Sequence, residues 1–340
     1  MQTIYIRVDM NPIIATGHIM RCLSIADEIR AFGGNTIFIS ADEYPVQLLE
    51  ERGFESIVLN SDSTDMECEL PQMIDLIHNR GISKLLVDSY DVTETYLQTL
   101  REYTTLIYLD DVDAFSYPVD SLICYANYYS AFSYGKRTQK EGYYLGTDYV
   151  PLRKVFRNCQ PKKICDEVSK VLLLSGGTDL CHIIDRMVEK FKDRTDVTLI
   201  TICGRYYEEF EQLKNTYKEY PNLEFYQNVS NLEEYMLEAD LAISAGGTTL
   251  YELCAVGTPT ISYSFADNQL YNVRQFAEDE VIDYAGDVRT DDIFANVVKL
   301  YGKYSKDTAL REMRSRKMQK LVDGQGAKRI AEVLLKQNVI

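Results

Sequence analysis

The chain has 340 residues, of which 46% are hydrophobic and 26% charged, a composition that excludes disordered and fibrous proteins. Its length exceeds one ordinary hydrophobic core and predicts two domains of about 150 residues each. No apolar run reaches the roughly 18 residues of a membrane span, and the N-terminus lacks the basic and apolar regions of a signal peptide. The eight cysteines have no CxxC spacing, so we expect reduced thiols in a cytoplasmic protein.

The net charge of −16 is unevenly distributed along the chain. Residues 1–150 contain 10 Lys and Arg against 23 Asp and Glu, a net charge of −13, whereas the remaining residues have 26 against 29, a net charge of −3. An acidic first half repels nucleic acid and anionic lipid surfaces. We therefore expect neither nucleic acid nor a membrane among the partners of this protein.

Short β-branched runs alternate with helical stretches through residues 1–150. This alternation predicts right-handed βαβ units on a mainly parallel sheet, and hence a doubly wound first domain. The first helical stretch ends in a glycine, which is a typical stop signal. Strands are expected, in chain order, at 3–9, 35–40, 56–59, 84–88, 105–110 and 121–125, with helices at 20–33, 71–81 and 94–103.

The same alternation starts again after residues 151–167, a stretch with two prolines and mixed charge that we interpret as a linker. It predicts a second doubly wound domain over 168–323 and a C-terminal helix within 324–340. Two such domains place the carboxyl ends of their strands, and any ligand, around a cleft between them. The predicted fold is therefore α/β, with two Rossmann-like domains facing a cleft. Strands of the second domain are expected within 169–179, 197–204, 223–227, 239–247 and 258–264.

Three loops, at 16–18, 175–179 and 244–249, contain glycine and connect a strand to a helix. Glycine lets the backbone approach an anion, which the N–H groups and the dipole of the helix start then stabilise. Neither of the later loops has the spacing of a phosphate-loop or dinucleotide fingerprint, which argues against an NTPase or a nicotinamide enzyme. The alternative for each loop is an ordinary turn.

Glu252 lies four residues after Thr248, on the same face of the helix that the third loop begins. A carboxylate at this position could bind both hydroxyls of a ribose while the helix start binds its phosphates. The alternative is a solvated helix carboxylate, although its sequence neighbours are mostly apolar.

His18 follows a glycine at the point where a strand gives way to a helix. The positive end of the helix dipole disfavours the imidazolium form, and a neutral imidazole can accept a proton from water. General-base catalysis of this kind contributes roughly 10²–10⁴-fold. Asp9, at the end of the first strand, is a candidate to orient the ring, and Arg21 lies one turn further along. A helix cap or surface histidine, and a surface arginine in an ion pair, are the alternatives.

Several sequence blocks occur in the order of a known family. "RVD" at 7–9 with "TGHIMRCLSIA" at 16–26 is the most specific, and the chain resembles the UDP-2,4-diacetamido-2,4,6-trideoxy-β-L-altropyranose hydrolases of pseudaminic acid biosynthesis. These belong to the GT-B superfamily and are similar to the murein glycosyltransferase that adds N-acetylglucosamine. The resemblance covers nearly the whole chain through "VDSY" (87–90), "YLDD" (108–111), "GTDYVPLR" (146–153), "SGGTD" (175–179), "SAGGTTLYEL" (244–253) and "DNQ" (267–269).

The resemblance implies hydrolysis of a UDP-sugar at its anomeric carbon, which releases UDP and the free sugar with inversion. It implies no metal and no organic cofactor, so the partners are a UDP-sugar and water. His18 would activate the water, the backbone around Tyr226 would hold uracil, and Tyr90 would line the sugar side. With the loop residues, the candidate substrate-binding residues are Gly17, Gly176, Gly177, Thr178, Asp179, Tyr226, Gly246, Gly247, Thr248, Thr249, Glu252, Asn268 and Gln269.

Two positions depart from the family pattern. The family has a histidine where this chain has Ser89, and the loop "NPIIAT" at 11–16 lacks an extra glycine. Both differences concern the sugar pocket, so the resemblance specifies the uridine nucleotide better than the sugar.

Two other functions are compatible with this fold. The first is a GT-B glycosyltransferase that uses a UDP-amino sugar and a separate acceptor. The net charge of −13 in the first half argues against a lipid-linked acceptor, but a soluble acceptor stays open. The second is a non-catalytic protein that binds nucleotide sugars, against which the presence of His18 argues.

Overall fold

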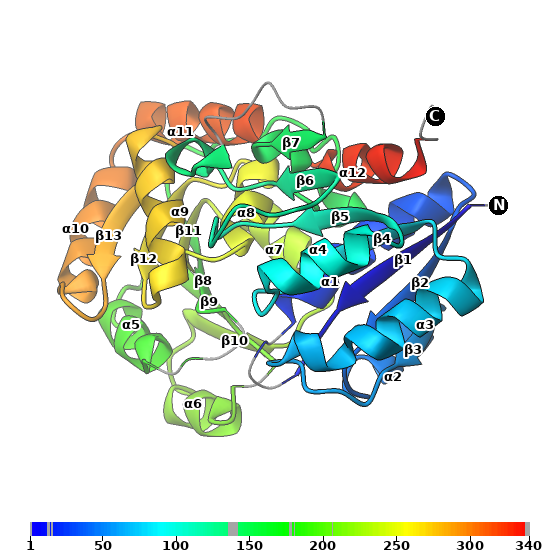
Figure 1. The fold of residues 1–340 in the computed structure, drawn as a ribbon. Helices are drawn as coiled ribbons and strands as arrows, with labels where there is room; N and C mark the ends of the chain where they lie inside the picture. The colour runs from blue at the N-terminus through cyan, green and yellow to red at the C-terminus, as the bar shows by residue number, and fades with distance from the viewer. Residues whose placement is uncertain are drawn as a thin grey trace. The chain divides into compact units, whose positions relative to one another are not determined.

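The computed structural model describes residues 2–11, 14, 16–134, 142–176, 179, 181–205 and 207–336. The chain divides into two compact units (Figure 1). Unit 1 comprises the chain up to Lys154 together with the residues from Gln325 onward, and unit 2 runs from Val155 to Gly324. The stretch expected to be a linker therefore contributes mostly to unit 2, and the C-terminal helix belongs to unit 1.

Unit 1 is built on a seven-stranded sheet in the order β3-β2-β1-β4-β5-β6-β7, and every neighbouring pair is parallel. The order reverses direction between β1 and β4, which makes their carboxyl ends the switch point where doubly wound sheets bind ligands. The strands are β1 (Thr3–Val8), β2 (Asn35–Ser40), β3 (Glu55–Val58), β4 (Lys84–Asp88), β5 (Thr105–Leu109), β6 (Ser121–Cys124) and β7 (Tyr143–Leu145).

The central strand β4 is buried along its whole length because helices cover both faces of the sheet. Its first residue, Lys84, donates from Nζ to the carbonyl oxygen of Leu334 at 2.9 Å and to that of Lys336, so it anchors the end of the last helix. The helices of unit 1 are α1 (Gly17–Ala31), α2 (Val46–Glu51), α3 (Leu70–Arg80), α4 (Glu94–Arg101) and α12 (Gly326–Leu335).

Unit 2 has a six-stranded sheet in the order β10-β9-β8-β11-β12-β13, again with parallel neighbours. Its switch point lies between β8 and β11. The strands are β8 (Lys170–Leu174), β9 (Thr198–Cys203), β10 (Leu223–Gln227), β11 (Leu241–Ala245), β12 (Thr260–Ser264) and β13 (Asp283–Asp287); the helices are α5 (Ile183–Phe191), α6 (Phe210–Thr216), α7 (Leu232–Glu238), α8 (Thr249–Val256), α9 (Asp267–Glu278), α10 (Ile293–Tyr304) and α11 (Thr308–Leu321).

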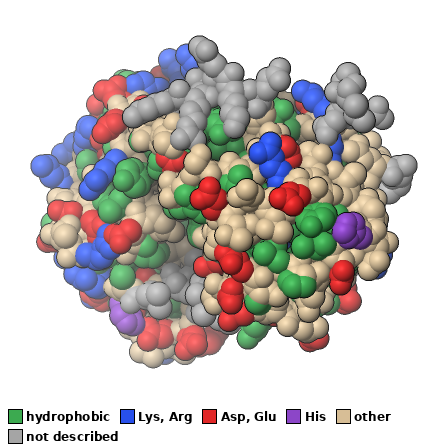
Figure 2. Space-filling view, viewed as in Figure 1, with side chains coloured by type: hydrophobic (Ala, Val, Ile, Leu, Met, Phe, Trp, Pro, Cys, Tyr) green, Lys and Arg blue, Asp and Glu red, His purple; other side chains and the backbone are tan. Residues whose placement is uncertain are grey.

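The surface charge follows the asymmetry of the sequence. On the face shown in Figure 2, acidic side chains are frequent over unit 1, whereas Lys and Arg side chains gather on the side of α10 and α11. None of the described helices combines the length and the apolar content that a membrane crossing requires. All eight cysteines are free thiols, and Cys22, Cys124, Cys203 and Cys254 are buried.

Candidate active site

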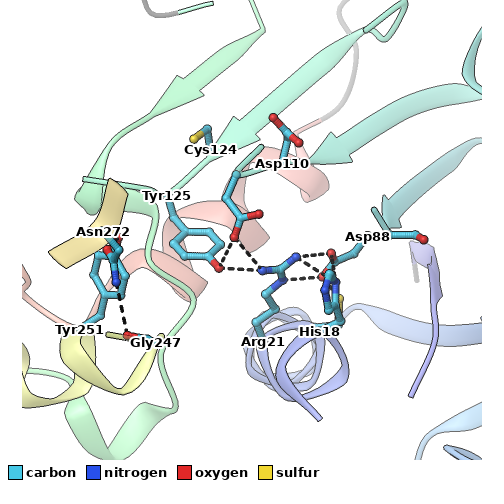
Figure 3. A network of polar contacts seen from close by, with 12 residues as sticks. His18, Arg21, Asp88, Asp110, Cys124, Tyr125, Gly247, Tyr251 and Asn272 are labelled. Carbon is cyan, nitrogen blue, oxygen red and sulfur yellow. Dashed lines mark hydrogen bonds and ion pairs between the residues drawn. The ribbon is translucent and has the colours of Figure 1, made fainter. Parts of the chain in front are cut away.

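The switch point of unit 1 carries the first group of predicted residues. Asp88 ends β4 and lies beside Val8 of β1 in the sheet register. Helix α1 begins at Gly17, so His18 is in its first turn. Figure 3 shows His18 and Arg21 projecting from α1 toward Asp88.

His18 pairs with Asp88 through a short contact. Nδ1 of His18 lies 2.7 Å from Oδ1 of Asp88, and the two side chains are 9% and 0% exposed. Because a carboxylate only accepts hydrogen bonds, this contact favours the tautomer of the neutral ring that carries its proton on Nδ1. The lone pair is then on Nε2, where it can accept a proton.

Arg21 binds the same carboxylate. Its Nε donates to Oδ2 of Asp88 at 2.7 Å, and its Nη2 contacts Oδ1. Burial alone would raise the pKa of Asp88, but the guanidinium, together with His18, holds this pKa well below its usual range. Asp88 is therefore a carboxylate near neutral pH.

The opposite side of the Arg21 guanidinium is also held. Its Nη1 donates to Oη of Tyr125 at 2.6 Å and lies 3.3 Å from Oδ2 of Asp111. Tyr125 in turn donates to the same oxygen of Asp111 at 2.9 Å. These two residues follow β6 and β5, so Arg21 connects the carboxyl ends of three neighbouring strands (Figure 3).

Tyr90 lies against the His18 ring in an edge-on arrangement, with 4.6 Å between the ring centroids. Burial of its hydroxyl, and then the nearby Asp111 carboxylate, raise the pKa of Tyr90 above its usual range, although its ring is partly exposed. Tyr90 is therefore a neutral phenol beside the imidazole.

Asp9 does not have the predicted role. One of its oxygens, Oδ2, lies 2.6 Å from Nη1 of Arg7, and the other accepts the backbone N–H of Ala41 at 2.8 Å. The prediction that Asp9 orients His18 is thus wrong, because Asp88 occupies the Nδ1 position. Asp9 instead belongs to a buried ion cluster in which Arg7 also forms a two-point pair with Glu69.

The loop after β11 is the best-defined part of the predicted nucleotide site in unit 2. A Cβ atom on Gly246 would lie 2.3 Å from Cγ1 of Val273, so only glycine allows α9 to pack so closely. Asn272 donates to the carbonyl oxygen of Gly246 at 2.9 Å and accepts from the Tyr251 hydroxyl at 2.8 Å. The loop is therefore held by buried neutral groups.

Helix α8 follows this loop and presents its N–H groups without a side-chain cap. Gly247 has open space around the position of a Cβ, Thr248 is exposed, and Thr249 is half-buried. Glu252 lies in the first turn and is also half-buried. An uncapped helix start beside a glycine can bind an anion.

The loop after β8 has a different arrangement. Gly176 adopts a φ of +92°, which favours glycine. Both oxygens of Asp179 accept backbone N–H groups at the start of α5, from Ile183 and Ile184, each at 2.9 Å. Asp179 therefore caps α5 with its own negative charge. Gly177 and Thr178 lie outside the described residues.

The remaining predicted residues of unit 2 are not all brought together. Gln269 packs against Gly246 and accepts the backbone N–H of Phe265 at 3.1 Å, and Asn268 is exposed at the start of α9. Tyr226 lies on the edge strand β10, separated from β11 by β9 and β8. Its hydroxyl donates to Glu224 at 3.0 Å.

Sequence reasoning missed the residues that hold the predicted ones in place. Asp88 could have been found, because it ends a buried strand next to β1 in a doubly wound order. Asp111 and Tyr251 stand in the blocks "YLDD" and "SAGGTTLYEL", which did not single them out, and no local pattern distinguishes Tyr125 and Asn272. The described residues contain no group of three or more His, Cys, Asp or Glu side chains that could hold a metal ion.

Known proteins resemble this chain in sequence and in fold. The model of the glycosyltransferase family 28 C-terminal domain matches residues 171–332. The chain is 26% identical over 259 residues to an uncharacterized protein of Methanocaldococcus jannaschii, which covers 72% of the chain and 52% of that protein. It is 30% identical over 167 residues to the UDP-N-acetylglucosamine–N-acetylmuramyl-(pentapeptide) pyrophosphoryl-undecaprenol N-acetylglucosamine transferase of Campylobacter jejuni, over 45% and 46% of the two chains. The chain thus spans about half the length of the curated relatives it matches.

The fold likeness extends over the whole chain. The crystal structure of Acinetobacter baumannii MurG aligns with a TM-score of 0.73 over 99% of this chain and 100% of that chain, at 12% identity. The protein therefore has the two parallel-sheet α/β domains of the GT-B fold. The fold class predicted from the sequence is confirmed.

Proposed function

We propose that the protein hydrolyses a UDP-diacetamido-trideoxy sugar at its anomeric carbon, with inversion, and that His18 is the general base. The observation that carries the proposal is the buried pair of His18 and Asp88, with Nδ1 and Oδ1 2.7 Å apart. This pair leaves Nε2 of the ring as a proton acceptor. The residues Arg21 and Tyr90 complete this part of the site.

In the proposed reaction a water oxygen attacks the anomeric carbon from the face opposite UDP, as inverting glycosidases do. Nε2 of His18 accepts a proton from this water, while Asp88 stabilises the imidazolium that forms. The bond between the anomeric carbon and the UDP oxygen breaks, and UDP leaves with the electron pair. The product is the free sugar with inverted configuration.

Unit 2 is proposed to bind the UDP moiety. The N–H groups at the start of α8, beside Gly246 and Gly247, are fixed donors for the diphosphate, and such preorganised donors stabilise a developing charge. Thr248, Thr249 and Glu252 would contact the nucleotide. The glycosyltransferase family 28 match over residues 171–332, which includes these residues, supports this assignment.

The identity of the sugar rests on the resemblance to the hydrolases of pseudaminic acid biosynthesis. Ser89, which replaces a histidine of that family, is 6% exposed and accepts the backbone N–H of Asp91 at 3.1 Å. Tyr90, Asn268 and Gln269 are the residues proposed to contact the sugar.

A second candidate function is transfer of the sugar to a separate acceptor. The name of the Campylobacter jejuni relative, an N-acetylglucosamine transferase, favours it. In that reaction His18 would deprotonate an acceptor hydroxyl instead of water. A protein that binds nucleotide sugars without catalysis is the third possibility.

The test is to incubate the protein with the UDP-diacetamido sugar without an acceptor and to measure UDP release. We expect turnover that falls by roughly 10²–10⁴-fold in His18→Asn, with UDP binding retained in calorimetry. The matched control is His78→Asn, since His78 is an exposed histidine on α3, and its turnover should be unchanged. UDP release only after an acceptor is added would favour the transferase, and binding without release would favour the binding protein.

A further inference from the structure

We infer that Arg21 sets the proton affinity of His18 by sharing the Asp88 carboxylate, and that Asp111 and Tyr125 are positioning residues that act through Arg21. The inference rests on the proposed function in taking His18 as the base. It adds a way in which Arg21, and through it two residues that do not contact that ring, adjust the basicity of His18.

Asp88 divides its two oxygens between several donors. Oδ1 faces Nδ1 of His18 at 2.7 Å and also contacts Arg21, and Oδ2 accepts from Nε of Arg21 at 2.7 Å and from the Cys22 thiol at 3.3 Å. A carboxylate paired with a histidine alone would strongly favour the imidazolium form. A permanent cation on the same carboxylate offsets much of that attraction.

Arg21 also acts on His18 directly. Its Nη2 lies 3.0 Å from Nδ1 of the ring, close enough for its charge to disfavour a second positive charge there. Arg21 stays protonated throughout: although burial favours its neutral form, Asp88, Tyr125 and Asp111 raise its pKa well above the usual range. The cation is therefore constant, and only the ring changes its charge.

Asp111 and Tyr125 fix where this cation lies. Oδ2 of Asp111 is 3.3 Å from Nη1 of Arg21, and Oη of Tyr125 accepts from the same nitrogen at 2.6 Å. The guanidinium is thus held from both sides, by Asp88 on one and by Asp111 with Tyr125 on the other. The negative charge of Asp111 partly offsets the positive charge of the Arg21 guanidinium. It therefore favours the imidazolium form of His18.

Other titratable groups around the ring act in the same field. Tyr90 is a neutral phenol that meets the ring edge-on at 4.6 Å. Asp91, whose pKa is raised by burial and then by Asp9, also interacts with His18 and with Asp62. These groups are unchanged in the variants below. Differences in the titration midpoint of His18 between the variants therefore come from Arg21 and Asp111.

The two charges of this network predict opposite effects. Arg21→Gln removes the cation, so protonated His18 becomes more stable and the midpoint of its titration should rise by about one pH unit. Asp111→Asn removes a carboxylate, and the midpoint should fall by about half a unit. Tyr125→Phe, which keeps every charge, should change the midpoint by less than Arg21→Gln or Asp111→Asn does.

The experiment is an NMR titration of the imidazole signals in the full chain, without substrate. The chain has three histidines, so His18→Asn identifies the His18 signal by its loss. Because this measurement needs no turnover, it stands even if the protein does not hydrolyse a UDP-sugar. Shifts of opposite sign in Arg21→Gln and Asp111→Asn support the inference; shifts of the same sign, or none, overturn it.

Two further variants separate charge from packing. Arg21→Lys keeps the positive charge and should restore a midpoint close to that of the unmodified protein. Thermal unfolding shows which variants are folded. If Arg21→Gln does not fold, Asp111→Asn alone still tests the inference. Asp111 is partly exposed, and its replacement leaves the pairs of Asp88 with His18 and Arg21 intact. A midpoint that does not fall in folded Asp111→Asn overturns the inference by itself.

Discussion

In unit 1 the residues that end or follow the central strands are charged and buried, whereas in unit 2 the corresponding residues are glycines and neutral polar side chains. In unit 1 the buried charged residues are Asp88, which is 1% exposed, and Asp110, which is 0% exposed. In unit 2 the corresponding residue after β11 is Gly246, whose carbonyl oxygen accepts a hydrogen bond from Asn272 of α9. The central strand order is the same in both sheets, so topology gives each sheet a candidate site at its switch point, while the side chains determine its chemistry.

The difference has a physical consequence for each unit. Buried charges can transfer protons and stabilise other charges, but each needs a partner because an unpaired buried charge is costly. Backbone N–H groups beside glycine bind an anion without introducing a titratable group. This division suits a proposed reaction in which unit 1 supplies the base and unit 2 binds the diphosphate.

The largest expected effect comes from breaking the charged site of unit 1. In Asp88→Asn the amide can donate to Nδ1 of His18, which places the ring proton on Nε2 and removes the acceptor. We expect kcat for UDP release to fall roughly 10³–10⁴-fold, with UDP affinity unchanged in calorimetry. Asp75→Asn, an exposed change on α3, is the control and should leave both quantities unchanged. A kcat within tenfold of the original would contradict the pairing.

A smaller effect concerns the free energy of unfolding and its dependence on pH. Burial, and next the Asp111 carboxylate, raise the pKa of Asp110 from 3.8 to about 6, against the opposing N–H of Asp113. The native state therefore binds this proton more tightly than the unfolded chain does. The contribution of Asp110 to the free energy of unfolding is present below about pH 4 and is lost as pH rises through about 6.

Asp110→Asn should remove this dependence. Relative to the unmodified protein, the free energy of unfolding of the variant should rise between pH 4 and pH 8 by up to about 3 kcal/mol. Urea unfolding at both pH values measures this difference, with Asp75→Asn again as the control. A difference that stays constant across this range would mean that Asp110 is not the titrating group.

The smallest effect concerns the neutral site of unit 2. Gly246→Ala forces a contact with Val273 and should lower the free energy of unfolding by about 1–3 kcal/mol. Gly247→Ala is the matched change, since nothing lies within 4 Å of its added Cβ, and stability should be unchanged. UDP affinity should nevertheless fall in Gly247→Ala if the diphosphate approaches the backbone there. Thermal unfolding and calorimetry on the two variants separate packing from binding.

Local sequence patterns were sufficient for most of the fold. Buried strands such as β2 and β4 were predicted with their observed bounds, because continuous apolar runs are a direct signal of strands covered on both faces. The edge strands β7 and β13 and the short helix α2 were missed. β7 and β13 are only partly buried, so no apolar run marks them in the sequence.

The sequence by itself determined the two doubly wound sheets, the glycine loops and the position of His18 at a helix start, because each depends on residues close together in the chain. Only the tertiary structure decided which carboxylate holds that ring. Asp9 and Asp88 end neighbouring strands, and Asp88, which pairs with His18 across 70 residues of sequence, is the one whose side chain reaches Nδ1. Such pairings depend on strand order and side-chain direction, which exist only once the sheet has formed.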